Sequence, residues 1–304
     1  TYFPCAAAAA EAGFRPCLRC RPETAPGTPA WVGASTTVAR ALRLIDDGAL
    51  DAGDIDALSN RLGVSSRHLR RLFDEHLGAS PISVALTRRL LFARRLLTET
   101  TLPMSDVAFG SGFSSLRRFN DAALKAWRVP PTTVRRRDKS PSGGTIELTL
   151  GYREPFDWNG LLGFLKMRAI AGIESIEGNV YRRTIQLGGT AGIVEVRPSA
   201  SAPVLFLSVP IDFARDLGRI VGRTRRLFDL DADTSAIGAV LGRDSLLSRL
   251  VKRRPGLRVP GAWDPFELAI RAILGQQVSV KGASTLAARL VRTGGRLVVS
   301  VPNE

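Results

Sequence analysis

Apolar positions recur with two different periods along the chain and divide it into helical and strand-like regions. Between residues 36 and 137, and again after residue 212, apolar side chains return every three or four positions, which predicts amphipathic helices. One helix is also predicted from about residue 158 to 171. Around it, apolar residues alternate or run together, which predicts strands at 146–150, 192–196 and 204–209. The predicted order is helical, then α+β, then helical.

Two linkers separate these regions. Residues 22–33 contain several prolines and glycines, and residues 135–144 combine a charge run with small residues, so neither has the period of a helix or a strand. A chain of 304 residues is long enough for two or three domains. The sequence therefore predicts a multidomain protein of the α and α+β classes, divided into the parts 1–24, 35–137, 145–212 and 213–304.

One helical design occurs twice within residues 35–137. In the first copy a glycine turn follows an apolar helix, and Ser65 can cap the next helix, whose basic side chains point outward. The stretch Gly112-Phe113-Ser114-Ser115 repeats Gly63-Val64-Ser65-Ser66 after 49 residues, and a proline follows each copy at a nearly matching distance. A long helix between the copies would fix their separation, and its outer face is predicted to carry Arg88, Arg89, Arg94 and Arg95.

A glycine turn followed by a capped, basic helix is how a recognition helix is placed in the major groove of DNA. A lone histidine on such a helix could be a metal ligand, but we interpret His68 as a phosphate or base contact. The region resembles the DNA-binding domain of AraC-type regulators, which implies binding to promoter sites. Two recognition helices in one chain remove the usual need for a dimer, so we expect a monomer. The predicted DNA contacts are Ser66, Arg67, His68, Arg70, Arg71, Ser115, Arg117, Arg118 and Asn120.

The charge of the chain supports the same kind of partner. The formal net charge is +15, from 43 Lys and Arg against 28 Asp and Glu, and both halves share the surplus. Such an excess suits a polyanion, because each cation placed near a phosphate releases condensed counterions. A ribosomal or membrane-surface protein is the alternative. We favour double-stranded DNA, because the basic residues fall on predicted recognition helices.

Cysteine is rare in this chain, with three residues in all: Cys5, Cys17 and Cys20. This sparse use, together with the lack of a secretory signal or of an apolar run that could cross a bilayer, predicts a cytoplasmic protein, associated with the nucleoid, with no membrane partner. We expect Cys5 to be a small buried thiol. The Cys17-Leu18-Arg19-Cys20 spacing alone allows half a zinc site, a redox pair or a chance match.

The arginine-flanked stretch around this spacing, residues 13–22, resembles the C-terminal end of the Ada-type methylphosphotriester domain. In that domain two cysteine pairs hold zinc, and one thiolate of the first pair accepts a methyl group. The resemblance implies that Cys17 and Cys20 are the second pair. The first pair would precede Thr1, so we expect this sequence to bind zinc poorly and to lack the methyl acceptor.

Residues 145–294 resemble the 3-methyladenine DNA glycosylase II (AlkA-type) family. The resemblance implies an antiparallel-sheet α+β domain followed by the start of an all-helical helix-hairpin-helix domain. It also implies hydrolysis of N-glycosidic bonds of alkylated bases without a cofactor. The residues that carry it are 155–158, 162–165, 226–230, 254–261 and 264–280.

Three residues in this region are candidates for a site. Phe164 matches an aromatic residue that lines the family's base pocket, where an electron-poor alkylated purine can stack, although a phenylalanine in such a sequence can also be core. Gly275 ends a helix capped by Asp264 and projects Gln276 and Gln277 from a tight corner. An enzyme that turns a base out of the stack needs a plug for the gap, and the resemblance places this wedge at Gln277. Alternatively, both amides only satisfy backbone groups at a helix junction.

The catalytic Asp and the helix-hairpin-helix of that family come after the matching segment. Because the sequence begins at Thr1 and stops at Glu304, we expect it to be cut at both ends and to be inactive in base excision. Our interpretation is a fused regulator and repair enzyme for DNA alkylation damage. The alternative is a non-enzymatic AraC-type activator that senses the damage. A ligand-sensing regulator is disfavoured, because residues 145–210 resemble the glycosylase front domain.

Overall fold

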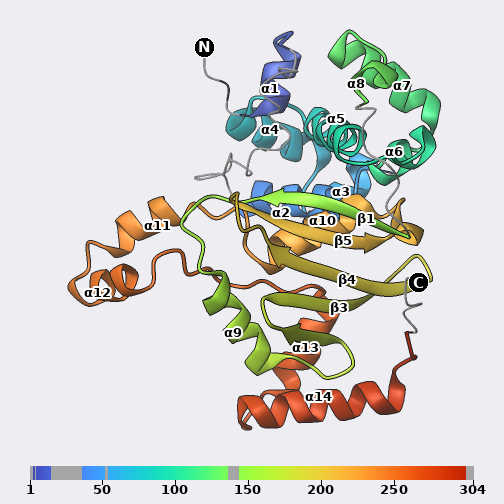
Figure 1. Cartoon of the computed structure of the whole chain (residues 1–304). Coiled ribbons are helices and arrows are strands. Elements are labelled where there is room, and N and C mark those ends of the chain that lie inside the picture. The colour runs from blue at the N-terminus through green and yellow to red at the C-terminus, as the bar shows by residue number, and fades with distance from the viewer. Residues whose placement is uncertain (1–2, 4, 15–35, 52–53, 136–143, 299–304) are drawn as a thin grey trace. The chain divides into compact units, whose positions relative to one another are not determined.

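The structure is a computed structural model, and it describes residues 3, 5–14, 36–51, 54–135 and 144–298. The chain forms two compact units. The first consists of Thr1–Pro141 with Ala214–Gly222, and the second of Ser142–Phe213 with Arg223–Glu304. Along the chain, helices come first, then an antiparallel sheet with one helix, then helices again, as the sequence predicted (Figure 1).

The first unit is helical, and its long helix α5 (Pro81–Glu99) separates two helix pairs along the chain. The first pair is α3 (Ile55–Leu62) and α4 (Ser66–Leu77), and the second is α6 (Met104–Gly110) and α7 (Leu116–Trp127). The buried faces of these helices form the core, with Leu58, Leu69, Phe73, Phe119 and Trp127 almost fully buried. The unit also contains α1 (Ala6–Glu11), α2 (Thr36–Asp46), α8 (Pro131–Val134) and the start of α10 (Leu217–Leu227).

The cap of Ser65 and the turn at Gly63 are confirmed, but the 49-residue repeat is off by one at the cap, because the residue that corresponds to Ser65 is Ser115, 50 residues on, rather than Ser114. The hydroxyl of Ser65 accepts a hydrogen bond from the backbone N–H of His68, and Ser115 caps α7 in the same way through Arg118. Gly63 ends α3 in the left-handed conformation, with φ of 71°, where a glycine has no Cβ to clash. The two prolines that follow the copies occupy the first turns of α5 and α8, where the missing N–H has no helical partner to lose.

The prediction of an outward-facing row of arginines on α5 is wrong for Arg94 and Arg95, whereas Arg88 and Arg89 are half-exposed. Arg94 and Arg95 are buried, with 2% and 6% of their surface exposed, because helices of both copies and α1 surround α5. Arg95 forms an ion pair of 3.2 Å with Glu99. Arg89 donates hydrogen bonds to the carbonyl oxygens of Leu50 and Gly112. These arginines therefore hold the first unit together.

The helix α1 packs into the core of the first unit, where Ala7 and Ala8 are buried. Cys5 is half-buried rather than buried, and its thiol donates to the carbonyl oxygen of Leu77 at 3.3 Å. The described part of residues 1–24 thus packs with the helix pairs, which the sequence did not predict.

The second unit is built on a five-stranded antiparallel sheet in the order β1-β5-β4-β3-β2 (Figure 1). β1 (Thr145–Gly151), β4 (Thr190–Pro198) and β5 (Val204–Pro210) confirm the three predicted strands. β2 (Glu174–Glu177) and β3 (Val180–Leu187) escaped prediction. β2 has four residues, of which one is apolar, and in β3 a buried position is taken by Arg183, which breaks the apolar alternation.

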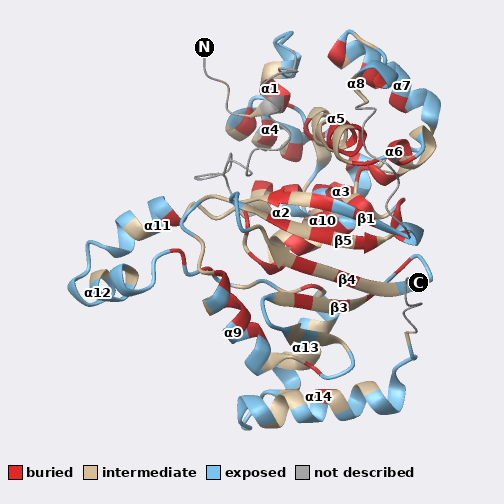
Figure 2. Ribbon diagram, viewed as in Figure 1, coloured by how far each residue is buried: buried red, intermediate tan, exposed pale blue. Residues whose placement is uncertain are grey.

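The predicted helix of this region is α9 (Trp158–Arg168), which buries Trp158, Leu161, Leu162 and Leu165. After the sheet come α10 (Leu217–Leu227), α11 (Thr234–Leu241), α12 (Ser245–Arg253), α13 (Pro265–Leu274) and α14 (Val280–Gly294). Figure 2 shows that α12, α13 and α14 are mostly exposed, and in them only Ala287 is buried. The core of the second unit therefore lies around the sheet and α9. In the described part of the chain, no helix is long and apolar enough to cross a membrane.

Candidate functional site

The outer face of α4 carries the predicted contacts of the first copy. Arg67, Arg70 and Arg71 are exposed, while Ser66 and His68 are half-buried. The Nδ1 atom of His68 lies 3.2 Å from a guanidinium nitrogen of Arg71, so the ring and the arginine face the same side of the helix. These side chains form an exposed cationic face on the helix that follows the glycine turn.

The outer face of α7 carries the matching contacts of the second copy. Arg117, Arg118 and Asn120 are exposed. Arg117 makes a loose ion pair of 3.9 Å with Asp121, and Arg118 donates to the hydroxyl of Ser114 at 3.2 Å. The structure thus places all nine predicted residues at the start of the two capped helices, although Ser115 uses its hydroxyl as the cap. Their contact with DNA stays a prediction.

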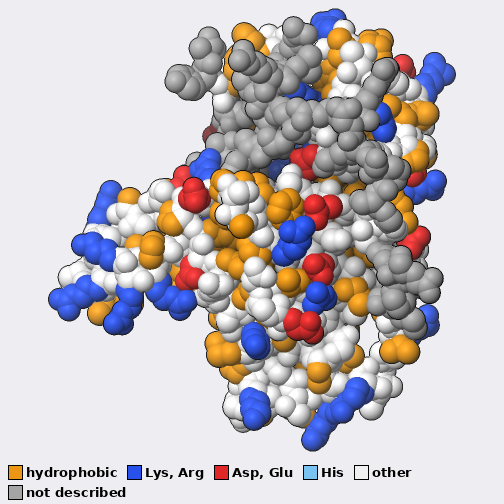
Figure 3. All heavy atoms as spheres, in the orientation of Figure 1, with side chains coloured by type: hydrophobic (Ala, Val, Ile, Leu, Met, Phe, Trp, Pro, Cys, Tyr) orange, Lys and Arg blue, Asp and Glu red, His pale blue; other side chains and the backbone are white. Residues whose placement is uncertain are grey.

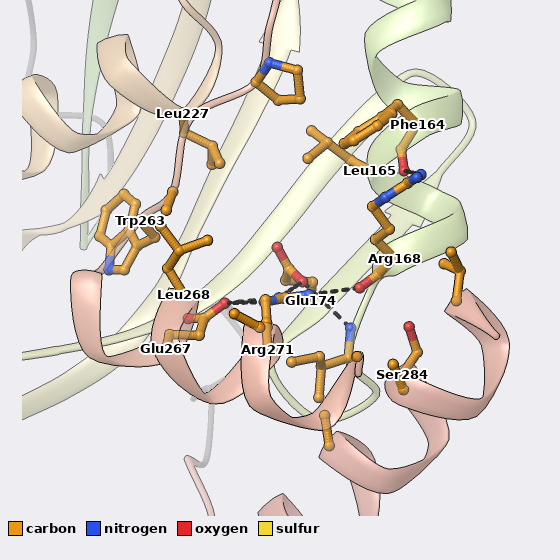
Figure 4. Close-up of a pocket in the computed structure, with 18 of the residues that line it drawn as sticks. Phe164, Leu165, Arg168, Glu174, Leu227, Trp263, Glu267, Leu268, Arg271 and Ser284 are labelled. Carbon is orange, nitrogen blue, oxygen red and sulfur yellow. Dashed lines mark hydrogen bonds and ion pairs between the residues drawn. The ribbon is translucent and has the colours of Figure 1, made fainter. Parts of the chain in front are cut away.

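A cavity of about 400 Å³ lies in the second unit, lined by α9, α13, α14 and residues 260–263 (Figure 4). Phe164 and Arg168 lie on one side of it and Trp263 on the other. Phe164, the predicted base-pocket residue, keeps 37% of its surface exposed and lines this cavity, so it is not simply core. Its role toward a base stays a prediction.

Sequence reasoning missed Trp263, which lines the cavity beside the cap of α13. The Trp263 ring is 6% exposed, and the guanidinium groups of Arg183 and Arg223 lie 5.3 and 5.7 Å from its centroid. The signal was present in the sequence, because an aromatic residue directly precedes the capping Asp264.

A charged network forms one wall of the cavity. The Glu174 carboxylate pairs with Arg183 at 3.1 Å and with Arg271, and it accepts a hydrogen bond of 2.7 Å from the hydroxyl of Tyr181. Glu267 pairs with the same two arginines. Burial, reinforced by the Glu174 carboxylate, raises the pKa of Tyr181 far above its usual value, so the phenol keeps its proton.

This network decides what the cavity can do chemically. Among the described residues that line it, Glu174 and Glu267 are the acidic ones, and each is neutralised by two arginines. Both carboxylates are therefore already engaged in ion pairs, whereas the rings of Phe164 and Trp263 line the cavity and can pack against an aromatic group.

Gln276 and Gln277 lie in the turn between α13 and α14, and both are exposed, which confirms the predicted corner. Gln277 has a φ of 59°, a left-handed conformation that is uncommon outside glycine. Their neighbours Gly275 and Val278 line the cavity, so the turn lies at its edge. The wedge function of the two amides stays a prediction.

Comparison with known proteins links both units to characterised families. The helix-turn-helix domain family matches residues 58–137, and the AlkA N-terminal domain family matches residues 147–264. The chain is 45% identical over 303 residues to a probable bifunctional transcriptional activator/DNA repair enzyme AlkA of Mycobacterium tuberculosis. That alignment covers 98% of this chain and 61% of the relative.

An AraC-type helix-turn-helix domain is joined here to an AlkA N-terminal domain.

Two further relatives each match one part. DNA-3-methyladenine glycosylase 2 of Escherichia coli is 34% identical over 154 residues, which are 51% of this chain and 52% of that protein. The HTH-type transcriptional regulator GlxA of Rhizobium meliloti is 39% identical over 87 residues, which are 29% of this chain and 27% of that protein. The AraC-type and AlkA-type resemblances found in the sequence are thereby confirmed, whereas the Ada-type resemblance stays a prediction. This chain spans 61% of the length of the mycobacterial relative.

The matched ranges separate the candidate residues into groups. The helix-turn-helix match contains both recognition helices, and the AlkA N-terminal match contains Phe164 and Trp263 but ends at Asp264. Cys17 and Cys20 lie outside the described residues, so the zinc prediction stays a prediction. In the described ranges, no group of three or more His, Cys, Asp or Glu side chains could hold a metal ion.

The AlkA N-terminal domain also carries exposed positive charge near its end. Figure 3 shows Lys and Arg side chains gathered over the α11–α12 region. The exposed cations there are Arg243, Arg249, Lys252, Arg253 and Arg254.

Proposed function

We propose that this chain takes part in the response to DNA alkylation damage, binding double-stranded DNA with its first unit and an alkylated base with its second. The observation that carries the proposal is the mycobacterial relative, named a probable bifunctional transcriptional activator/DNA repair enzyme, which aligns with both units over 98% of this chain.

The first unit supports sequence-specific binding to promoter sites. Two copies of a capped helix present exposed arginines, and Arg can contact both phosphate oxygens and the guanine edge in the major groove. Because both recognition helices belong to one chain, the proposed regulator is a monomer, which light scattering of the DNA-free protein tests.

The second unit supports binding of a flipped base. A cavity of about 400 Å³ is within the range of small-ligand sites, and the aromatic Phe164 and Trp263 line it. An aromatic face attracts an electron-poor or cationic ring more strongly than a neutral one. The cavity thus suits a purine that carries an extra alkyl group and a positive charge.

Removal of the base by N-glycosidic hydrolysis is proposed for a longer protein that contains this chain, and residues 213–304 are proposed to begin its helix-hairpin-helix domain. For this chain we propose binding without excision, because Glu174 and Glu267 are tied to arginines. The same observation favours the second candidate function, a non-enzymatic activator that senses damage. An assay for release of 3-methyladenine or 7-methylguanine from methylated DNA by the full-length protein distinguishes the repair enzyme from the non-enzymatic activator. If no base is released, the damage-sensing activator is the better account.

Two finer assignments complete the proposal. Cys17 and Cys20 are proposed to be the second cysteine pair of an Ada-type domain and to hold zinc together with its first pair, and metal analysis of a longer protein that contains this chain tests this. The protein is proposed to work in the cytoplasm on the nucleoid, and fluorescence microscopy of a tagged full-length protein tests the location.

The experiment that tests the proposal compares this chain on unmodified and methylated duplexes with and without the promoter site. We expect the promoter to strengthen binding through Arg70 and Arg71, and methylation to strengthen it through the cavity. Equal binding to all four duplexes would contradict the proposal.

A further inference from the structure

The cavity of the second unit contains a cation that its ion-pair network does not use. Of the described residues that line the cavity, three are arginines, and two of them, Arg183 and Arg271, are paired with Glu174 and Glu267. Arg168 is different. Among the described residues, no carboxylate lies within ion-pair distance of Arg168, so its charge is not neutralised by a carboxylate at the edge of the cavity.

The side chain of Arg168 lies on the aromatic face that a base would need. Its guanidinium carbon is 3.7 Å from the centroid of the Phe164 ring, one helical turn earlier on α9 (Figure 4). It also donates a long hydrogen bond of 3.4 Å to the carbonyl oxygen of Phe164. A base that stacks on this face of Phe164 must first displace the guanidinium group.

The rest of Arg168 is fixed. Its backbone carbonyl oxygen accepts a hydrogen bond of 2.7 Å from Arg271, which is itself held by Glu174 and Glu267. The helix end therefore stays in place while the half-exposed side chain can leave the ring. Once the guanidinium group has left the ring, its charge has no carboxylate partner, while the backbone of Arg168 stays in place. The group can therefore bind an anionic group that is attached to the base.

We propose that Arg168 couples the base to its phosphate: its guanidinium group covers Phe164 in the empty cavity and moves to the phosphate of the nucleotide whose base replaces it. The inference rests on the proposed function of the cavity and adds to it a substrate preference. A nucleotide within a strand offers both the base and the phosphate, whereas a released base offers no partner for the displaced cation. The movement of Arg168 from Phe164 to the phosphate thus favours binding of nucleotides over binding of free bases and nucleosides.

Calorimetric titration of the intact chain with 7-methylguanosine and with 7-methylguanosine 5′-monophosphate tests this coupling. Arg168→Met keeps the unbranched apolar stem and removes the charge, and Lys166→Met removes an exposed charge from the same helix outside the cavity lining. We expect Arg168→Met to bind the nucleoside about two- to fivefold more tightly than the unsubstituted chain, because it has no cation–π contact to break. It should lose about tenfold of the preference for the monophosphate.

The controls make the outcome decisive. Arg168→Lys should retain part of the phosphate preference, because an ammonium group can still contact the phosphate, and Lys166→Met should change neither affinity. If Arg168→Met has the same ratio of monophosphate affinity to nucleoside affinity as the unsubstituted chain, or binds the nucleoside more weakly, the coupling is overturned while the base pocket stands. If no protein, including the unsubstituted chain, binds either probe, the base pocket itself is contradicted together with the coupling.

Discussion

Gly78 and Arg128 end the two recognition helices in the same left-handed backbone conformation, each with a φ of 62°. They occupy corresponding positions in the two copies, one residue after α4 and one residue after α7, and the N–H of each bonds back to the carbonyl oxygen four residues earlier. Glycine adopts this conformation at no steric cost, whereas an arginine is strained by its Cβ.

The first prediction follows from this pair. Arg128→Gly should increase the free energy of unfolding by about 0.5–1 kcal/mol, because it removes the Cβ strain, and Gly78→Ala should decrease it by about 1 kcal/mol. Urea denaturation followed by circular dichroism measures both changes. A loss of stability in Arg128→Gly would mean that the arginine side chain stabilises the fold by contacts that outweigh the strain.

The second prediction concerns the charged wall of the cavity. Glu174 and Glu177 lie at the two ends of β2, and their side chains are 5% and 75% exposed. Glu174→Gln should decrease the free energy of unfolding by about 3–5 kcal/mol, because it removes one of the two carboxylates that neutralise Arg183 and Arg271. Glu177→Gln should cost less than about 1 kcal/mol. Similar losses in the two variants would contradict this view of the network.

The third prediction separates the strain at Gln277 from its proposed use. Gln277→Gly should raise the free energy of unfolding by about 1 kcal/mol, because the residue has a φ of 59°. If the side chain fills the gap left by a flipped base, the same variant should bind a duplex with an abasic site severalfold more weakly. Gln276→Ala is the neighbouring control. Unchanged binding in Gln277→Gly would favour the alternative in which both amides only serve the helix junction.

The fourth prediction is a pH dependence. A hydrogen bond from the backbone N–H of Ala236, aided by Arg153, lowers the pKa of Asp233 below its ordinary value of 3.8. A carboxylate with a lowered pKa stabilises the folded chain above the unfolded pKa, and the contribution disappears as the pH falls through the folded one. Asp233→Asn keeps the cap of α11 without the charge. It should therefore have a lower free energy of unfolding than the unsubstituted chain at neutral pH and the same one in acid. A difference in stability that grows as the pH falls would contradict the prediction.

The fifth prediction concerns the first recognition helix. Arg70→Ala and Arg71→Ala should each weaken DNA binding and reduce its salt dependence by about one counterion. Arg43→Ala, which removes an exposed arginine of α2 outside both recognition helices, should have a smaller effect. If a longer protein that contains this chain releases alkylated bases, as proposed, the two variants should lose more promoter binding than base release in that protein. Equal losses in the two assays would contradict a division of labour between the units.

Sequence patterns predicted the features that depend on a few neighbouring residues. The cap of Ser65, the turn at Gly63 and the strand β5 all follow from local hydrogen bonding or from apolar alternation. Features that depend on long-range packing were not predictable in this way. Arg94 sits on a helix that looks amphipathic in sequence, yet helices from distant parts of the chain bury it.

The lining of the cavity was also only partly predictable from the sequence. Phe164 was found through family resemblance, but Glu174 and Arg183 come from two strands that the apolar pattern missed. The stacking of Arg168 on Phe164 depends on side-chain conformation, which no sequence pattern specifies.

The central claim is that this chain binds double-stranded DNA through its cationic recognition helices, and fluorescence anisotropy with a labelled duplex over a range of salt concentrations tests it most directly. The account predicts tight binding at low salt that weakens steeply, on the order of 10³-fold between about 50 and 200 mM salt if several phosphates are contacted. Arg70→Ala should give a shallower slope. Absent binding, or an affinity that does not change with salt, would contradict it.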